Sequence, residues 1–192
     1  MRTILYVIFA ITTMLFTSAC TPPSHMIVKD KPWQDIRSVV PQKGKSALVI
    51  ARTVSFGGGV EFNTYLDKKM IGVTQRKGFF TKTDVSPGLH YVITKAENME
   101  PVKIMFEQDR IYYLLQIPRL GFWKARVSVA PVSPDKMMTS WDDNVVQLEY
   151  NPKDPGEDLS GHDFEEAVKD YERELGEGTH KDHQEYRGFR AK

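Results

Sequence analysis

The chain has 192 residues, of which 41% are apolar and 11% aromatic, enough for one domain with its own core. Its 26 basic and 25 acidic residues nearly balance, which argues against binding to nucleic acid or an anionic lipid surface through global basic charge. A single cysteine excludes an intrachain disulfide, so packing alone must hold the fold together.

The first twenty residues are typical of an export signal. Arg2 precedes an apolar run over residues 4–16, and small residues at 17–19 lead to Cys20. This segment resembles a bacterial lipoprotein signal, in which the cysteine is acylated and becomes the mature N-terminus. Thr17 departs from the pattern, which usually has Leu three positions before the cysteine. We therefore predict a signal peptide over residues 1–19 and lipidation at Cys20.

Two alternatives compete with acylation. The segment would be an uncleaved anchor if it spanned the bilayer, but its apolar run is shorter than the roughly 20 residues that a span needs. An ordinary secretory signal cleaved nearby would leave Cys20 as an unpaired thiol, whereas acylation consumes it. Thr21 stands where an Asp would retain a lipoprotein at the inner membrane. The expected location is the periplasmic side of the outer membrane.

Residues 20–45 are expected to form a lipidated N-terminus and a flexible tether. Four prolines interrupt regular structure there, and several lysines keep the segment solvated. Such a tether would let the domain stand roughly 25–30 Å from its anchor. The near-helical spacing of Trp33, Ile36 and Val39 leaves open the alternative that this segment docks on the domain.

From Ser46 the pattern changes to short runs with period-two alternation and β-branched residues. Strands are expected over residues 47–54, 60–66, 70–74, 78–83, 89–94, 102–106, 110–117 and 125–132. Their spacing predicts an all-β fold over 46–133, an antiparallel β-sandwich of seven to eight strands. The expected core comprises Leu48, Ile50, Phe62, Leu66, Phe80, Tyr91, Ile93, Ile104, Phe106, Tyr112 and Leu114.

Residues 134–176 are expected to form a C-terminal extension with one helix. Residues 144–150 are a candidate edge strand, and apolar residues at helical spacing predict a helix over 163–175. Ser160 is placed to cap that helix. The helix either packs on the sheet or offers its apolar stripe to a partner. Residues 177–192 are polar without an apolar period, and we predict a disordered tail.

Several short motifs within residues 47–132 resemble an uncharacterised family of small bacterial lipoproteins, a domain of unknown function. They are LVIAR at 48–52, YLD at 65–67 followed by IGV at 71–73, VSPGLH at 85–90 and IYY at 111–113. The resemblance implies a β-sandwich similar to PEGA-type and carboxypeptidase-regulatory-type domains, and a location outside the cytoplasm. It implies no activity and no catalytic residue.

Candidate chemical groups have simpler structural interpretations. Gly57, Gly58 and Gly59 precede a strand, whereas a phosphate-binding loop opens a helix. His180 and His183 would need further ligands to hold a metal; His162 and Glu185 are candidates that no sequence feature fixes in place, and the two histidines lie in the expected polar tail. His90 follows a turn without a nearby nucleophile. Acidic pairs at 142–143 and 163–166 are typical of a turn and a solvated helix face.

An aromatic cluster flanked by cations is the remaining candidate site. Phe122 and Trp123 lie in an expected loop with Arg119 nearby, and Tyr113 lies in the preceding strand. Aromatic residues beside cations are common in protein interfaces, so we predict that Phe122, Trp123, Tyr113 and Arg119 form a binding surface. The alternative is that the two loop aromatics fold back and close one end of the sandwich.

These features predict a non-catalytic envelope lipoprotein without a cofactor or metal. Its expected partners are the membrane, through the lipid anchor, and another envelope protein, with no role for nucleic acid. One alternative is an envelope hydrolase or a glycan- or ligand-binding accessory protein, which would need a concave site with convergent ionisable groups. Another is a lipid-carrying module, which would need an internal cavity.

Overall fold

The computed structural model describes residues 22–30, 35–121 and 125–191. The strands are β1 (Met26–Val28), β2 (Ser46–Arg52), β3 (Phe62–Leu66), β4 (Lys69–Thr74), β5 (Gly78–Val85), β6 (Gly88–Lys95), β7 (Met99–Phe106), β8 (Arg110–Leu120), β9 (Ala125–Pro131), β10 (Val146–Tyr150) and β11 (Phe189–Arg190). The helices are the 3-10 turn η1 (Ile36–Ser38), α2 (Pro134–Met138), α3 (Gly161–Gly176) and α4 (Lys181–Glu185). Among the described residues, no helix combines the length and hydropathy of a membrane span.

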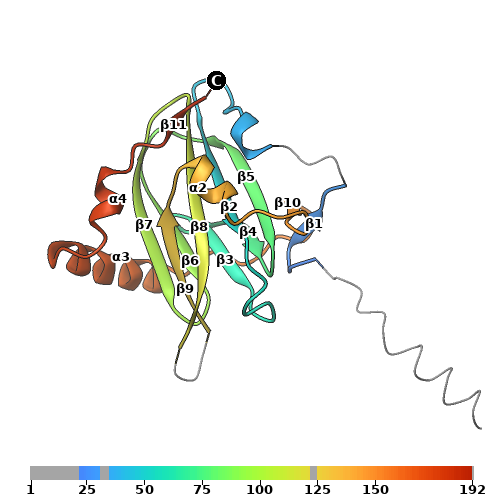
Figure 1. Cartoon of the computed structure of the whole chain (residues 1–192). Coiled ribbons are helices and arrows are strands. Elements are labelled where there is room, and N and C mark those ends of the chain that lie inside the picture. Colours follow the sequence, from blue (N-terminus) through green and yellow to red (C-terminus); the bar gives the residue numbers. More distant parts are fainter. Residues whose placement is uncertain (1–21, 31–34, 122–124, 192) are drawn as a thin grey trace, which may run out of the picture.

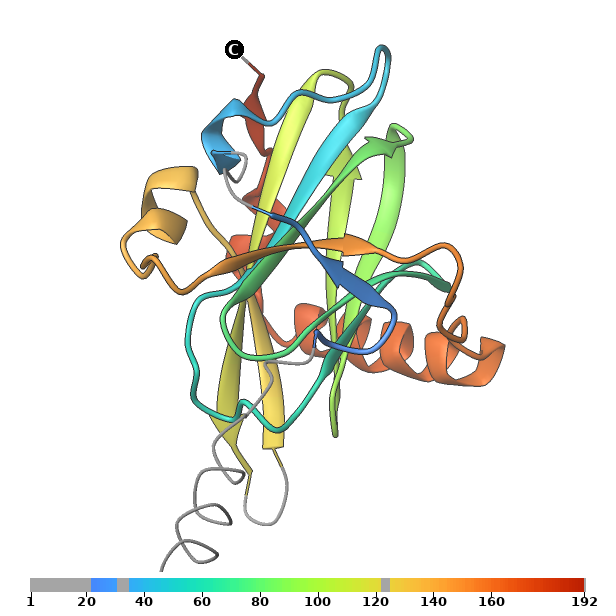
Figure 2. The same cartoon turned by 90° about the vertical axis from the view of Figure 1, so that its right-hand side faces the viewer.

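The strands form two sheets that pack face to face, as Figure 1 shows. The larger sheet has the order β1-β10-β5-β2-β8-β11, with β9 paired to β8, and the smaller sheet has the order β4-β3-β6-β7. In Figure 2, η1 and α2 lie outside the larger sheet, and α3 lies on the other side of the molecule. The predicted β-rich, two-sheet architecture is therefore confirmed.

The prediction of a purely antiparallel sandwich is wrong, because the larger sheet is mixed. β8 runs parallel to β2, and β10 runs parallel to β5. Strand spacing predicts which neighbours in sequence form hairpins, but these pairs are distant in sequence. The available signal was the continuous apolar run of β2, which is buried on both faces as strands of parallel sheets are.

The space between the sheets holds the predicted core. Nine of the eleven predicted core residues are buried, and Leu66 and Tyr91 are partly buried against them. Tyr91 and Ile93, however, face outward from the smaller sheet. Their neighbour Thr94 points inward to Gln116, and successive residues of a strand point to opposite faces. Helix α3 covers this outer face and buries Ala167 and Tyr171, so it packs on the sheet.

A second apolar cluster, whose members were not part of the expected core, covers the outer face of the larger sheet. It joins strand residues to side chains from η1 and α2, and its buried members are Ile36, Val39, Ala47, Val49, Ala51, Phe79, Ile111, Tyr113, Met137 and Val145. This cluster explains why every residue of β2 is buried.

The described part of residues 20–45 docks on the sandwich, as the alternative interpretation of this segment expected, and does not form a flexible spacer. β1 pairs with β10, and Met26 is buried with its sulfur accepting a hydrogen bond from the Val73 backbone. Ile36 and Val39 are buried against the larger sheet. Four prolines do prevent a long regular element, but a three-residue edge strand and a single 3-10 turn fit between them.

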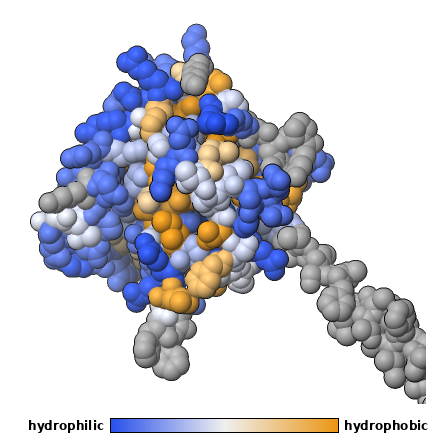
Figure 3. Space-filling model, viewed as in Figure 1, coloured by the Kyte–Doolittle hydropathy of each residue, from blue (hydrophilic) through white to orange (hydrophobic). Residues whose placement is uncertain are grey.

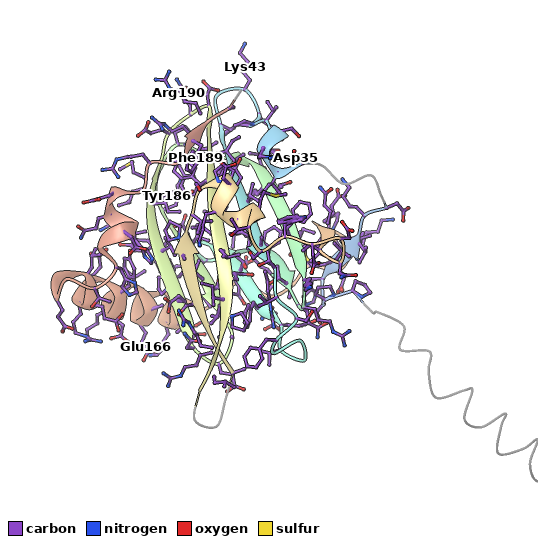
Figure 4. The ribbon with its side chains drawn as sticks, viewed as in Figure 1. Asp35, Lys43, Glu166, Tyr186, Phe189 and Arg190 are labelled. Carbon is purple, nitrogen blue, oxygen red and sulfur yellow. The ribbon has the colours of Figure 1, made fainter. Side chains whose placement is uncertain are left out.

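The C-terminal tail is also ordered, contrary to the prediction of disorder for 177–192. It contains α4 and β11, and β11 pairs with β8 (Figure 4 labels Tyr186 and Phe189 of this segment). The Tyr186 hydroxyl donates to the Tyr113 and Val132 carbonyls and accepts from the Tyr113 backbone N–H. The tail is thus held by a few isolated aromatic side chains, and isolated residues leave no periodic signal in the sequence.

The two sheets are joined internally by a small polar network. Gln116 of β8 is buried, and its amide nitrogen donates to the hydroxyls of Thr64 and Thr94, both at 3.0 Å. Its amide oxygen accepts from the hydroxyl of Thr74. Because all four side chains are buried and Gln116 is hydrogen-bonded to each threonine, the network fixes how the sheets face each other.

We predict that Gln116→Leu lowers the free energy of unfolding by about 1–3 kcal/mol, because three buried threonine hydroxyls lose their partner. Adding valine at Thr64, Thr74 and Thr94 should restore most of that loss, since both sides of each hydrogen bond are then apolar. Denaturant unfolding followed by circular dichroism measures both variants. Wild-type stability in Gln116→Leu, or a further loss in the quadruple variant, would contradict this account.

Candidate binding surface

Of the predicted site residues, the structure describes Tyr113 and Arg119. Cys20, Phe122 and Trp123 lie outside the described residues. Tyr113 is buried, its hydroxyl donates to the Ile36 carbonyl at 3.0 Å, and burial raises its pKa to about 12. Its assignment to a binding surface is therefore wrong. Arg119 is exposed near the end of β8.

The glycine-rich loop between β2 and β3 is organised by a buried arginine. Arg52 donates to the Val60 and Phe56 carbonyls, both at 2.8 Å, and its guanidinium lies 4.1 Å from the centre of the Phe62 ring. Burial lowers the pKa of Arg52 to about 10, so it stays charged at neutral pH. Gly57 has a φ of +67°, and a Cβ there would lie 3.3 Å from the guanidinium. The loop closes over a cation of its own chain and offers no phosphate cradle.

His90 has a structural environment. One ring nitrogen lies 2.8 Å from the Asp67 carboxylate and the other 3.1 Å from the Ser86 carbonyl. Asp67 also accepts from the Tyr91 backbone, in a turn where its own φ is positive. Because both ring nitrogens are engaged, His90 joins the turn after β3 to the start of β6 and has no nitrogen left for a substrate.

His180 and His183 belong to an ordered aromatic stack, where the sequence had predicted solvated side chains. Their ring centres are 4.7 Å apart, and His180 also stacks on Tyr171 at 5.2 Å. His183 is 4% exposed, with its Nδ1 3.2 Å from the Tyr171 hydroxyl. His180 binds the Glu174 carboxylate. In the part of the chain that the structure describes, no three His, Cys, Asp or Glu side chains are grouped to hold a metal ion.

The strongest candidate for binding is a groove of about 440 Å³ beside this stack, which we call the Leu89 groove. It is lined by Leu89, Lys103, Met105, Tyr171, Leu175, His183, Gln184, Tyr186 and Arg187. Leu89 and Met105 are paired across β6 and β7, and each is 49% exposed. Helix α3 covers Tyr91 and Ile93 on the same face of the sheet but leaves this apolar pair open.

The rim of the Leu89 groove is polar. Lys103 lies 2.6 Å from the Glu172 carboxylate, and this hydrogen bond holds the pKa of Glu172 below its usual value. Arg187 donates to the Gln184 and Tyr186 carbonyls, and within the described residues it forms no ion pair with a carboxylate. Burial raises the pKa of Tyr171 to about 12, so that hydroxyl stays protonated. The groove can therefore hold an apolar side chain and place a carboxylate on Arg187.

The groove combines apolar side chains with a few polar groups from separate elements. Its lining contains no serine, cysteine or carboxylate, so it offers no pair of carboxyl groups. Sequence reasoning missed it because its parts come from β6, β7, α3 and the tail. One sequence signal was present: Leu89 alternates with Tyr91 and Ile93, the face of this strand that was expected to lie in the core.

Comparison of the chain with protein-family models, with curated proteins and with solved structures found no match.

We predict that the burial of the His183 imidazole makes the protein less stable at acidic pH. Burial holds its pKa below the ordinary 6.5, so the folded protein keeps this imidazole neutral while the unfolded chain takes up a proton. The stability that His183 contributes above pH 6.5 is therefore lost as the pH falls below that value, by up to about 1.4 kcal/mol per pH unit. The midpoint temperature of thermal unfolding should fall less steeply with decreasing pH for His183→Gln than for the wild type.

The matched control is His162→Gln, because His162 is largely exposed at the start of α3. This variant should keep the wild-type slope. An unchanged slope in His183→Gln would assign the pH dependence to other groups.

Proposed function

We propose that the protein is a non-catalytic lipoprotein of the bacterial envelope, anchored through Cys20, that binds another envelope protein in the Leu89 groove. The observation that carries the proposal is the open apolar pair Leu89 and Met105, on a sheet face that α3 otherwise covers. Exposed apolar side chains gathered in a groove are typical of protein-binding sites. The sequence pattern around Cys20 supports the anchor and the periplasmic side of the outer membrane as the location.

Three ionisable side chains have structural roles, which supports the non-catalytic part of the proposal. Arg52 closes a loop, His90 joins two turns, and His183 is stacked in the wall of the groove. The lipid-carrier alternative would need an internal cavity, whereas the space between the sheets is occupied by the apolar core and the Gln116 network. No observation in the described residues favours the hydrolase or accessory-protein alternative.

The expected partner presents an apolar side chain next to a carboxylate. The apolar side chain would fill the space over Leu89 and Met105, and the carboxylate would pair with Arg187 at the rim. Partly desolvated charge pairs of this kind fix the orientation of a partner more than they add affinity.

We predict that Cys20→Ala releases the full-length protein from the membrane fraction of its host, because the acylated cysteine is the proposed anchor. Fractionation followed by immunoblotting measures this, and mass spectrometry of the wild type should find acyl chains on Cys20 and no initiator methionine. Membrane retention of Cys20→Ala in high salt would contradict lipid anchoring.

We predict that a photoreactive amino acid at Met105 crosslinks to one defined protein in the intact envelope. Ile27, which is equally exposed but lies on β1, is the control position and should not give the same product. Arg187→Glu should reduce the yield at Met105, whereas Lys153→Glu, an equal charge change on an exposed residue outside the groove, should not. Equal products at positions 105 and 27 would contradict a binding site in the groove.

A further inference from the structure

The described chain begins close to the proposed anchor and is fixed there. Pro22 follows Cys20 by two residues, so their Cα atoms are at most about 7 Å apart. Pro23 is buried, and the Ser24 backbone N–H donates to the Glu61 carboxylate at 2.7 Å. An acylated Cys20 would therefore hold this part of the sandwich at the membrane, without the 25–30 Å of freedom that a flexible tether gives.

The start of the chain adjoins the loop between β2 and β3. Pro22 lines a hollow of about 280 Å³ with Ser55 and Arg76. The same loop packs on Arg76, since a Cβ at Gly58 would lie 2.8 Å from the Arg76 Cγ. On its other side the loop reaches β8, because a Cβ at Gly57 would lie 3.6 Å from Pro118.

This end of the sandwich exposes apolar side chains, and we call it the anchor end. Its exposed apolar residues are Val54, Phe56 and Leu120, of which Phe56 is 53% and Leu120 84% exposed. In Figure 1 the β2–β3 loop and the far ends of β8 and β9 lie together at the bottom, where Figure 3 shows hydrophobic surface. The opposite end carries polar residues such as Lys43 and Arg190 (Figure 4).

The charges of the anchor end fit a phospholipid surface. Arg76 and Arg119 are exposed, and within the described ranges neither forms an ion pair with a carboxylate. Lys77 pairs with Asp142, and Glu61 accepts the Ser24 backbone N–H, so two nearby acidic groups already have partners. Unpaired arginines beside exposed apolar residues favour the interface of a bilayer that contains anionic lipid.

We propose that the anchor end lies against the bilayer, with Phe56 and Leu120 inserted at the level of the lipid headgroups. This inference rests on the proposed acylation of Cys20, because the acyl chains hold the anchor end in place. It adds a fixed orientation: the long axis of the sandwich points away from the membrane, and the end with Lys43 faces the periplasm. A protein partner at the anchor end is the competing occupant, and the experiment distinguishes the two.

Single thiols can test this orientation, because acylation consumes the only cysteine of the wild-type chain. Phe56→Cys and Leu120→Cys are made in the full-length lipoprotein, with Lys43→Cys as the matched control at the opposite end. Each purified protein is labelled with an environment-sensitive fluorophore and reconstituted into phosphatidylethanolamine–phosphatidylglycerol vesicles. Labels at 56 and 120 should shift to the blue and lose intensity when the lipids carry a quenching group, and the label at 43 should do neither.

The outcomes separate the inference from the proposed function. Acylated protein that floats with the vesicles but keeps the labels at 56 and 120 in water would overturn the orientation and leave the anchor intact. Protein without acyl chains that fails to float would overturn both. Labels that are shielded in native envelopes but not in pure lipid vesicles would assign the anchor end to a protein partner and overturn contact with the bilayer.

Discussion

The burial of β2 on both faces is the constraint on which the rest of the structure depends. One face packs into the core between the sheets through Leu48 and Ile50, and the other packs under η1 and α2 through Ala47, Val49 and Ala51. A strand buried on both sides needs two layers to cover it. The second layer comes from segments before and after the expected domain, so residues 46–133 do not bury this strand alone.

The same constraint determines where the chain ends lie. β1 and β10 extend one edge of the larger sheet, while β11 pairs with β8 on the other side of β2. Segments with little apolar content are thereby held by backbone hydrogen bonds and a few buried side chains, such as Met26 near the start and Tyr186 near the end. Order in these segments is tertiary in origin, because neither contains enough local pattern to form structure alone.

Local patterns in the sequence predicted the elements well and their surroundings poorly. Alternation located the strands β2 to β9, and the cap at Ser160 located the start of α3, because both depend on neighbours in sequence. The parallel pairing of β2 with β8 and the docking of the two chain ends depend on residues far apart in sequence. The Leu89 groove was missed for the same reason. Tyr113 was misassigned because the sequence pattern of a strand does not show whether other segments bury an aromatic residue on its outer face.

Docking of the N-terminal segment gives the two proposed surfaces different positions relative to a membrane. The turn after β6 lies near the anchor end, since Asn98 binds the backbone of Val127, and Val127 pairs with Pro118 two residues from Leu120. Leu89 lies at the other end of β6, six residues from Lys95, which corresponds to roughly 20 Å along the strand. With the anchor end on the bilayer, the Leu89 groove therefore stands clear of the lipid headgroups. A flexible tether would leave the distance between the Leu89 groove and the membrane undefined, whereas the fixed segment at 22–28 sets that distance. A partner must therefore reach the groove from the periplasm rather than from within the membrane plane.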